Sequence, residues 1–297
     1  MKSLTFFPHT ERESSPRNTV TAYNDTTGAL DAGARVKPTR PRAALIVFFL
    51  VSFGIPWATW IALRIRHTSF TEGPPLALMV GGAFCSVGGV VATYIEKGRS
   101  GLRDLAQRCV LYRVSVAWWL YALFLVLGVH VAATVIYAAV HGGVGPVRPL
   151  ELLRQWWLLY MFVFGLFQGP LAEELGWRGF LLPRLLNDYS PLQASVILGL
   201  IGTAWHINVF FSPIPTVALF TASLVAVSIL MTVMFLHTRG SVLLAIVMHW
   251  SIVPGKDIAR ISFPAAQEPP DWLRAVVGIA VALIIVVATR GKLSLSD

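Results

Sequence analysis

The sequence predicts an all-α polytopic membrane protein of about eight transmembrane helices, and three observations favour this class. Of the 297 residues, 55% are hydrophobic and 13% are charged, whereas about 25% are charged in an ordinary soluble domain. The apolar residues gather in runs of about 20, the length that crosses a hydrocarbon core about 30 Å thick. The net charge of +9 fits loop charges that orient such a protein in the bilayer. We therefore expect the lipid bilayer as a partner, and no nucleic acid.

The distribution of apolar runs divides the chain into three regions. Residues 1–42 are rich in Ser, Thr, Arg and Pro and contain no apolar core of signal-peptide type, so we expect a disordered cytoplasmic tail. Residues 43–289 form the transmembrane domain, and residues 290–297 form a short C-terminal tail. Apolar runs bounded by charges, Gly and Pro place the helices at residues 43–63, 76–95, 115–140, 157–182, 192–211, 215–236, 241–254 and 271–289.

The charges of the loops predict the orientation and location of the protein. Most Lys and Arg residues lie in alternate segments, beginning with the N-terminal tail, so both termini are predicted to be cytoplasmic. Retention and lipidation signals are lacking, which fits an integral protein of a prokaryotic plasma membrane.

Small residues form a stripe at helical spacing in the second predicted helix. Such a stripe lets another helix approach closely. Neither cysteine suggests a disulfide framework, because one lies in this apolar helix and the other, Cys109, lies in a basic loop. The members of the stripe are Gly81, Cys85, Gly88 and Gly89.

The loop from Glu96 to Arg113 predicts an amphipathic helix on the cytoplasmic membrane surface. Leu102, Leu105 and Ala106 fall on one side of this helix, and Arg103 falls on another.

Two adjacent carboxylates lie in the fourth predicted helix, in the stretch FGLFQGPLAEELGWRGFLLPRL. A carboxylate at bilayer depth costs several kcal/mol unless it is protonated, paired or facing a wet cavity. Glu174 and Arg178 are four residues apart in the order that favours an ion pair. Adjacent helical residues point about 100° apart, so Glu173 is left for chemistry.

Two histidines join this set from the fifth and seventh predicted helices, in GTAWHIN and IVMHW. A rise of 1.5 Å per residue places Glu173 about 13 Å, His249 about 12 Å and His206 about 21 Å from the inner ends of their helices. We expect these side chains to meet in a core of the fourth to seventh helices. His237 lies at the inner end of the sixth predicted helix, and His130 lies in the third with no acidic residue nearby, so both are expected to be packing or interface residues.

These side chains favour the hydrolysis of a peptide bond, which needs an activated water, oxyanion stabilisation and a proton for the leaving amine. In one version, Glu173 and His206 activate water directly and His249 stabilises the oxyanion. In the other, a divalent metal such as zinc is held by some of Glu174, His206 and His249, and Glu173 takes the proton from its bound water. The residue pattern leaves both versions open.

The motifs resemble the CAAX protease and bacteriocin-processing (CPBP, or Abi) family of intramembrane endopeptidases. The resemblance covers roughly residues 96–254 and rests on GPLAEELGWRGFLLPRL, on His206, and on the Thr238–Ser241 turn followed by His249. It implies that Glu173 and His206 activate water, that Glu174 is essential and that His249 lines the site. The implied substrate is a membrane-associated protein or peptide, prenylated or unprenylated.

Two positions depart from the pattern of that family. Gly202 stands where the family usually has Phe, and Val253 stands where it usually has the Asn or Asp that helps His249 to hold the oxyanion. Asn208 is a candidate substitute for that amide.

Three functions follow from this set of residues. The first is an intramembrane endopeptidase with a catalytic set of Glu173, Glu174, His206 and His249, supported by Arg178 and Asn208. The second is a catalytically weak or inactive membrane scaffold or immunity protein of the same fold, suggested by the two departures. The third is a proton-coupled transporter, because buried Glu and His also form proton relays.

Overall fold

The computed structural model describes residues 40–66, 75–154, 163, 165–167 and 169–294, and these parts contain helices and no strand. The predicted all-α class is therefore confirmed. The predicted tails lie largely outside the described residues and stay predictions. At the C-terminal end, however, Leu293 is fully buried and its amide donates to Thr289 Oγ1 at 3.2 Å, so the described part of that tail packs on the core.

Four described segments are long and apolar enough to cross a membrane. A fifth is α11 (Val242–Ser262), whose two halves meet at 47° beside Pro254; a proline inside a helix removes a backbone donor and bends the helix. These helices match the first, third, sixth, seventh and eighth predicted spans. The four segments are α2–η2–α3 (Pro41–Phe49, Leu50–Gly54 and Ile55–Ile65), α5 (Val116–Val140), α10 (Ile214–His237) and α12 (Asp271–Ala288).

The other three predicted spans are not among these segments, so by length and composition the described helices supply four or five of the eight predicted spans. Residues 76–95 form the first part of the longer α4 (Pro75–Cys109). The predicted helix over 192–211 is wrong in its second half, because α9 (Pro191–Trp205) ends after 15 residues and a 3₁₀ turn, η5 (Ile207–Phe211), follows.

The predicted helix over 157–182 is only partly described, and it is not continuous. Gly169 has non-helical dihedral angles, and a new helix begins at Pro170. This helix runs through α7 (Pro170–Gly176), the π-helical turn η4 (Trp177–Leu181) and α8 (Leu182–Asp188). A 3₁₀ turn, η3 (Pro149–Arg154), completes the elements.

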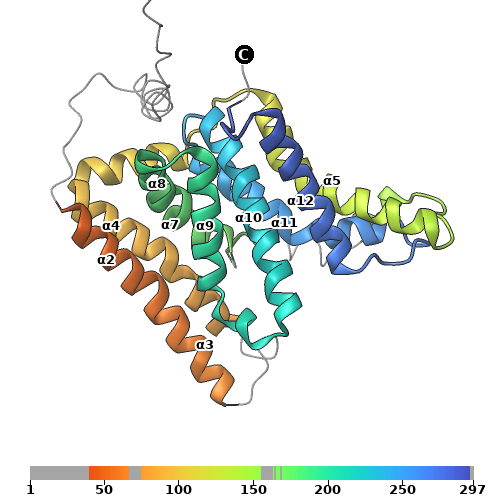
Figure 1. Ribbon diagram of the computed structural model, residues 1–297, viewed down its shortest axis with the longest axis horizontal. Coiled ribbons are helices and arrows are strands. Elements are labelled where there is room, and N and C mark those ends of the chain that lie inside the picture. The colour runs from red at the N-terminus through yellow and green to blue at the C-terminus, as the bar shows by residue number, and fades with distance from the viewer. Residues whose placement is uncertain (1–39, 67–74, 155–162, 164, 168, 295–297) are drawn as a thin grey trace, which may run out of the picture.

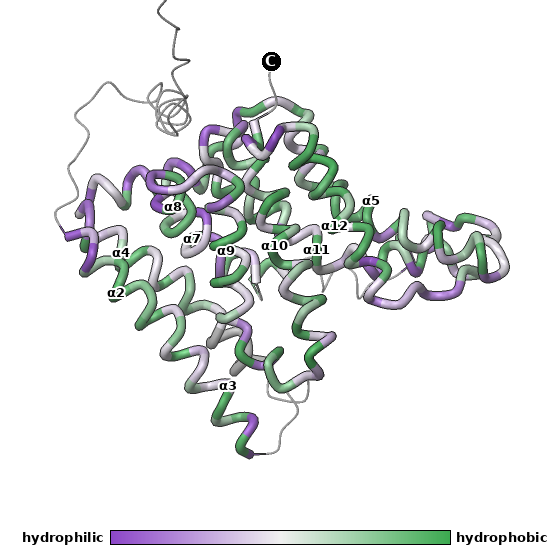
Figure 2. Tube along the Cα trace, in the orientation of Figure 1, coloured by the Kyte–Doolittle hydropathy of each residue, from purple (hydrophilic) through white to green (hydrophobic). Residues whose placement is uncertain are grey.

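The helices pack side by side in a series of neighbours, with α7 between α4 and α11 (Figure 1). α2 and α3 lie along α4, α4 packs on α7, and α7 packs on α11. α11 also contacts α5, while α10 packs between α9 and α12. Hydrophobic residues cover the helices, and hydrophilic residues gather at the end that carries α8 and the second part of α4 (Figure 2).

The predicted stripe of small residues in α4 allows two close helix contacts. A Cβ added at Gly88 would lie 2.4 Å from Ser52 Oγ, and one added at Gly89 would lie 2.7 Å from Gly176 Cα. The stripe therefore packs α4 against η2 on one side and against α7 on the other, which confirms its packing role. The surroundings of Gly81 lie outside the described residues.

The predicted surface helix is the second part of α4. Gly98 interrupts α4 with φ 60°, in the left-handed region that glycine adopts at little cost. Leu105 is buried and Arg103 is exposed, as expected. Ala106 is exposed, so its predicted place on the apolar side is wrong.

Two groups of buried side chains form the core, and α9 and α10 bring them together. One group centres on aromatic residues such as Phe48, Trp177 and Trp205. The other centres on aliphatic residues such as Met231 and Met248.

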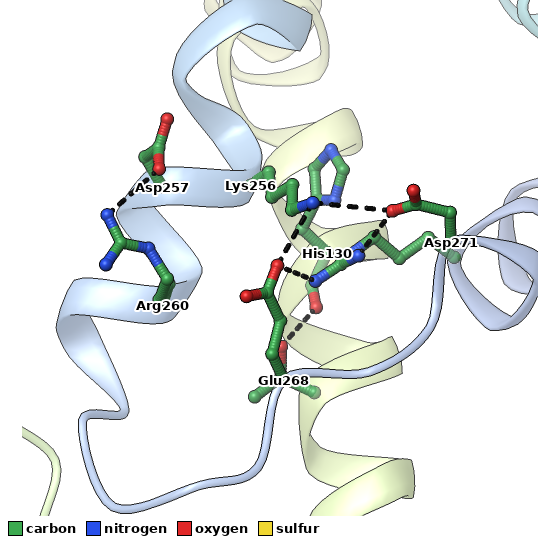
Figure 3. A network of polar contacts seen from close by, with 8 residues as sticks. His130, Lys256, Asp257, Arg260, Glu268 and Asp271 are labelled. Carbon is green, nitrogen blue, oxygen red and sulfur yellow. Dashed lines mark hydrogen bonds and ion pairs between the residues drawn. The ribbon is translucent and has the colours of Figure 1, made fainter.

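A network of charged side chains fixes the connection between α11 and α12 (Figure 3). Glu268 Oε1 lies 3.0 Å from Lys256 Nζ and 3.1 Å from Arg274 Nη2. Arg274 Nη1 donates to Asp271 Oδ1 at 2.7 Å. His130 of α5 lies beside these groups.

Candidate active site

The two adjacent glutamates lie in α7, which α4 holds by its backbone. Pro170 occupies the first turn, where its missing N–H costs no helical hydrogen bond. Ser86 Oγ donates to the carbonyl of Leu171 at 2.8 Å, and Cys85 Sγ donates to the carbonyl of Glu173 at 3.6 Å. Side chains of α4 therefore fix the start of α7, from which both carboxylates project.

Glu174, whose side chain is fully buried, is the centre of an ionic cluster. Arg178 Nη1 donates to both carboxylate oxygens, at 3.0 and 3.1 Å. His249 Nδ1 lies 2.7 Å from Glu174 Oε1 and donates to it. The predicted ion pair of Glu174 and Arg178 is confirmed. The carboxylate also holds the His249 ring in one orientation, with Nε2 on the opposite side.

Glu173 has a different environment from its neighbour. Its Oε2 accepts a hydrogen bond from Trp177 Nε1 at 3.1 Å. A methyl group added at Gly169 would lie 3.5 Å from Glu173 Oε1 and 3.1 Å from His249 Nε2. The free oxygen of the carboxylate and the free nitrogen of the imidazole therefore border the same space, which the glycine leaves open.

His206 lies directly after the last turn of α9. Its Nδ1 donates to the carbonyl of Gly202 at 2.8 Å, which leaves Nε2 with a lone pair. The rings of Trp205 and Phe220 meet the imidazole edge to face, with centroids 4.8 and 5.2 Å away. The backbone carbonyl and the two aromatic rings thus fix the orientation of the histidine.

A cavity of about 290 Å³ joins these side chains. Its walls come from α7, η4, α9, α10 and α11, so the predicted four-helix core does enclose a cavity. Apolar side chains of α9 and α10 form most of the wall. The polar lining residues are Glu173, Arg178, His206, Ser223, Ser228 and His249.

Two predicted residues do not line this cavity. Glu174 is not a lining residue, but it binds Arg178 and His249, which are. Asn208 is not among the lining residues, and its buried Oδ1 has no hydrogen-bond partner in the described part of the chain. The expectation that its amide substitutes near His249 therefore has no support in the geometry. The side chain of Val253 lies outside what the structure describes.

Three residues of the site were missed from the sequence. Trp177 follows Glu173 by four residues, a spacing that could have indicated the contact. Gly169 precedes a proline at a helix start, which is a recognisable signal. Ser228 lines the cavity with a buried Oγ that has no hydrogen-bond partner among the described residues, and nothing in its apolar surroundings predicts this.

The expected metal ligands do not fit a metal ion in this arrangement. Within the described ranges, no three His, Cys, Asp or Glu side chains are placed to share an ion. Both oxygens of Glu174 are occupied by Arg178, and His249 Nδ1 is turned to the same carboxylate. The positively charged guanidinium of Arg178, which is hydrogen-bonded to Glu174, would also repel a divalent cation bound to that carboxylate.

Comparison with known proteins identifies the segment that builds the cavity. A family model described as Type II CAAX prenyl endopeptidase Rce1-like matches residues 154–253. The chain is also 30% identical over 111 residues to CAAX prenyl protease 2 of Methanococcus maripaludis. The alignment covers 34% of the chain and 41% of that relative, so the similarity extends over less than half of either protein. Every residue that lines the cavity lies within the segment that the family model matches.

Proposed function

We propose that this protein is an intramembrane endopeptidase that hydrolyses a peptide bond with water activated by Glu173 and His206. The observation that carries the proposal is the cavity, where one carboxylate and two imidazoles from three separate helical segments meet. Buried ionisable groups in a membrane protein are costly, and they persist where they serve a site.

The three side chains divide the chemistry of hydrolysis between them. Glu173 Oε1 and His206 Nε2 are the free acceptors, so together they activate the attacking water. One of them takes the proton of the water as its oxygen bonds to the carbonyl carbon, and returns this proton to the leaving amine as the C–N bond breaks. His249 Nε2 faces the same space, while Glu174 stabilises positive charge on its ring. His249 therefore donates to the oxyanion of the tetrahedral intermediate, a contribution worth about 100- to 1,000-fold in rate.

The walls of the cavity favour a substrate with a lipid or apolar segment. Leu198, Phe220, Leu224, Val227 and Met231 surround the polar groups on the side of α9 and α10. The relative in Methanococcus maripaludis is CAAX prenyl protease 2. We therefore propose a membrane-associated peptide substrate, and we expect a prenylated peptide to be cleaved faster than an unprenylated one.

The departure at Gly202 is compatible with this activity. The carbonyl of Gly202, which any residue would supply, is the group that orients His206. A Cβ at this position would lie 3.1 Å from Leu224 Cδ2, so the glycine gives α10 and the cavity more room. The departure thus changes the shape of the wall and leaves the polar groups in place.

A cleavage assay in proteoliposomes tests the proposal. The purified protein is given farnesylated and unfarnesylated copies of one C-terminal peptide, and product is measured by mass spectrometry. We expect cleavage by the parent and a loss of at least about 100-fold in His206→Ala, because a general base contributes about 100- to 10,000-fold. His141→Ala is the matched control, since His141 is exposed on a loop.

Two outcomes contradict the proposal. One is a parent that cleaves neither peptide. The other is a His206→Ala variant that cleaves as fast as the parent and as His141→Ala, which indicates a scaffold in which the site is structural.

A further inference from the structure

Basic side chains line a second cavity, which lies at the hydrophilic end of the helix bundle (Figure 2). This cavity has a volume of about 210 Å³ and is bordered by α4 on both sides of Gly98, the η4–α8 segment and the α10–α11 turn. It shares no lining residue with the candidate active site. Its charged lining residues are Lys97, Arg108, Arg184 and Arg239, with Asp104 as the acidic member.

Two of the four positively charged side chains, Arg108 and Arg184, hold the walls of this basic cavity together. Arg108 Nε lies 3.1 Å from Asp104 Oδ2, and its Nη2 donates to the carbonyl of Gly179 at 2.9 Å. Arg184 pairs with Glu96 of α4. These contacts tie α4 to the η4–α8 segment and fix the positions of the walls.

The other two cations keep donors for a ligand. Lys97 is exposed. Its backbone carbonyl accepts a hydrogen bond from Ser100 Oγ, and its ammonium group makes no hydrogen bond or ion pair with another described residue. Arg239 makes one hydrogen bond, from Nη2 to the carbonyl of Arg113 at 2.8 Å. Arg184 Nε is buried and has no hydrogen-bond partner within the described residues. Besides Lys97 and Arg239, one of the two wall-forming cations, Arg184, therefore also has an unused N–H donor.

A tight turn keeps one of these groups at the cavity. Arg239 has φ 56° and Gly240 has φ 74°, and the left-handed region is uncommon for a residue other than glycine. The amide of Gly240 donates to the carbonyl of Phe235 at 2.9 Å. A backbone hydrogen bond therefore fixes the turn, and with it the position of Arg239.

Aromatic residues place this end of the molecule at the membrane surface. Tyr94, Tyr112 and Tyr189 are exposed by 54, 58 and 44%. Tyr94 lies in α4, Tyr112 follows the end of α4, and Tyr189 directly follows α8. Exposed tyrosines are enriched where a membrane meets water, at the level of the lipid headgroups. Val110, which precedes Tyr112 by two residues, is also 67% exposed.

We propose that the basic cavity binds the phosphate group of one anionic phospholipid. Phosphate oxygens accept short charge-assisted hydrogen bonds from Lys and Arg, and basic pockets between membrane helices are suited to lipid headgroups. The unused donors of Lys97, Arg184 and Arg239 supply these bonds. The exposed aromatic and aliphatic residues beside the cavity contact the lipid around the headgroup.

Native mass spectrometry of the delipidated protein in detergent tests this site. The full chain is titrated with phosphatidylglycerol and, separately, with phosphatidylcholine. We expect the parent to bind one phosphatidylglycerol in preference to phosphatidylcholine. The double variant Lys97→Gln/Arg239→Gln should bind it about 30-fold more weakly, because each lost charge weakens binding about fivefold.

A matched double variant controls for general attraction by positive charge. Arg99→Gln/Arg103→Gln loses the same charge from the same helix, where both side chains are exposed and neither lines the cavity. We expect its affinity to stay within about threefold of the parent, because a distant surface charge is screened. The single change Lys97→Gln, at an exposed side chain, tests the site without altering the turn.

Three results would overturn the proposal. In the first, Lys97→Gln and the double variant bind the lipid as the parent does. In the second, the control pair weakens binding as much as the cavity pair. In the third, inorganic phosphate at matched ionic strength displaces the lipid at millimolar concentration, which assigns the cavity to a soluble phosphate.

Discussion

Two ionic clusters of this protein use the same residue types in opposite environments. Glu174, Arg178 and His249 form the cluster behind the candidate active site, where the side chain of Glu174 is fully buried and that of Arg178 is 8% exposed. Glu268 and Arg274 belong to the cluster at the α11–α12 connection (Figure 3), where the side chain of Glu268 is 45% exposed. The geometry of the contacts is similar, with heavy-atom distances near 3 Å in both.

The difference in burial assigns different roles to the two clusters. An exposed ion pair is screened by water and contributes about 1 kcal/mol or less. A buried pair contributes little in itself, but the loss of one partner leaves an uncompensated charge that costs about 3–5 kcal/mol. The buried cluster therefore needs all of its members, and it orients His249. The exposed cluster holds the segment between α11 and α12 in place and contributes little to stability.

The largest expected effect comes from removing the buried arginine. Arg178→Met should lower the free energy of unfolding by about 3–5 kcal/mol, because the carboxylate of Glu174 then has only His249 as a partner. Thermal melting in detergent should show a shift of about 10 °C. Arg274→Met is the matched control, since Arg274 is also buried but its partners are exposed. We expect its cost to be about 1 kcal/mol, and equal costs for the two variants would contradict the comparison.

An intermediate effect is expected at the hydrogen bond to Glu173. Trp177→Phe keeps an aromatic ring against Phe48 and Trp205 but removes the donor that fixes Glu173 Oε2. A misplaced base lowers the rate of the chemical step, and we expect kcat to fall about tenfold with KM unchanged. The assay is peptide cleavage in proteoliposomes. A purely structural Trp177 would instead change the melting temperature and leave kcat intact.

The smallest effect is expected at Glu268. Its hydrogen bond to the Lys256 ammonium, together with Arg274, lowers the pKa of this carboxyl from its ordinary value. A lowered pKa in the folded state stabilises the protein above the ordinary pKa, and this stabilisation is lost as the pH falls through the folded value. The carboxyl is largely exposed, so Glu268→Gln should cost a few tenths of a kcal/mol near pH 7.

The pH dependence of melting checks the prediction for Glu268. The difference between the parent and Glu268→Gln should be constant near neutral pH and should disappear below the ordinary range of a glutamic acid. It should also shrink in 1 M salt, where the screening length is about 3 Å. A difference that grows on acidification would contradict the lowered pKa.

Much of the site could be predicted because polar residues are conspicuous in apolar helices. Glu173, His206 and His249 were placed in one core on that ground, and the four-residue spacing indicated the pair of Glu174 and Arg178. The interruptions were not predicted, since the unwinding of α9 at His206 has no proline or glycine beside it and depends on tertiary packing. Asn208 was a candidate because it follows His206 by two residues, but it lies in the 3₁₀ turn and does not line the cavity.

A paired measurement on two glutamates tests the central claim most directly, namely that Glu173 performs chemistry in the cavity. Glu173→Gln and Glu268→Gln are compared in the same proteoliposome assay, with melting temperatures recorded for both. We predict that Glu173→Gln lowers the cleavage rate by about 1,000-fold or more and keeps its melting temperature within a few degrees of the parent, while Glu268→Gln cleaves at the parental rate. A Glu173→Gln variant that cleaves a substrate as fast as Glu268→Gln would contradict the account.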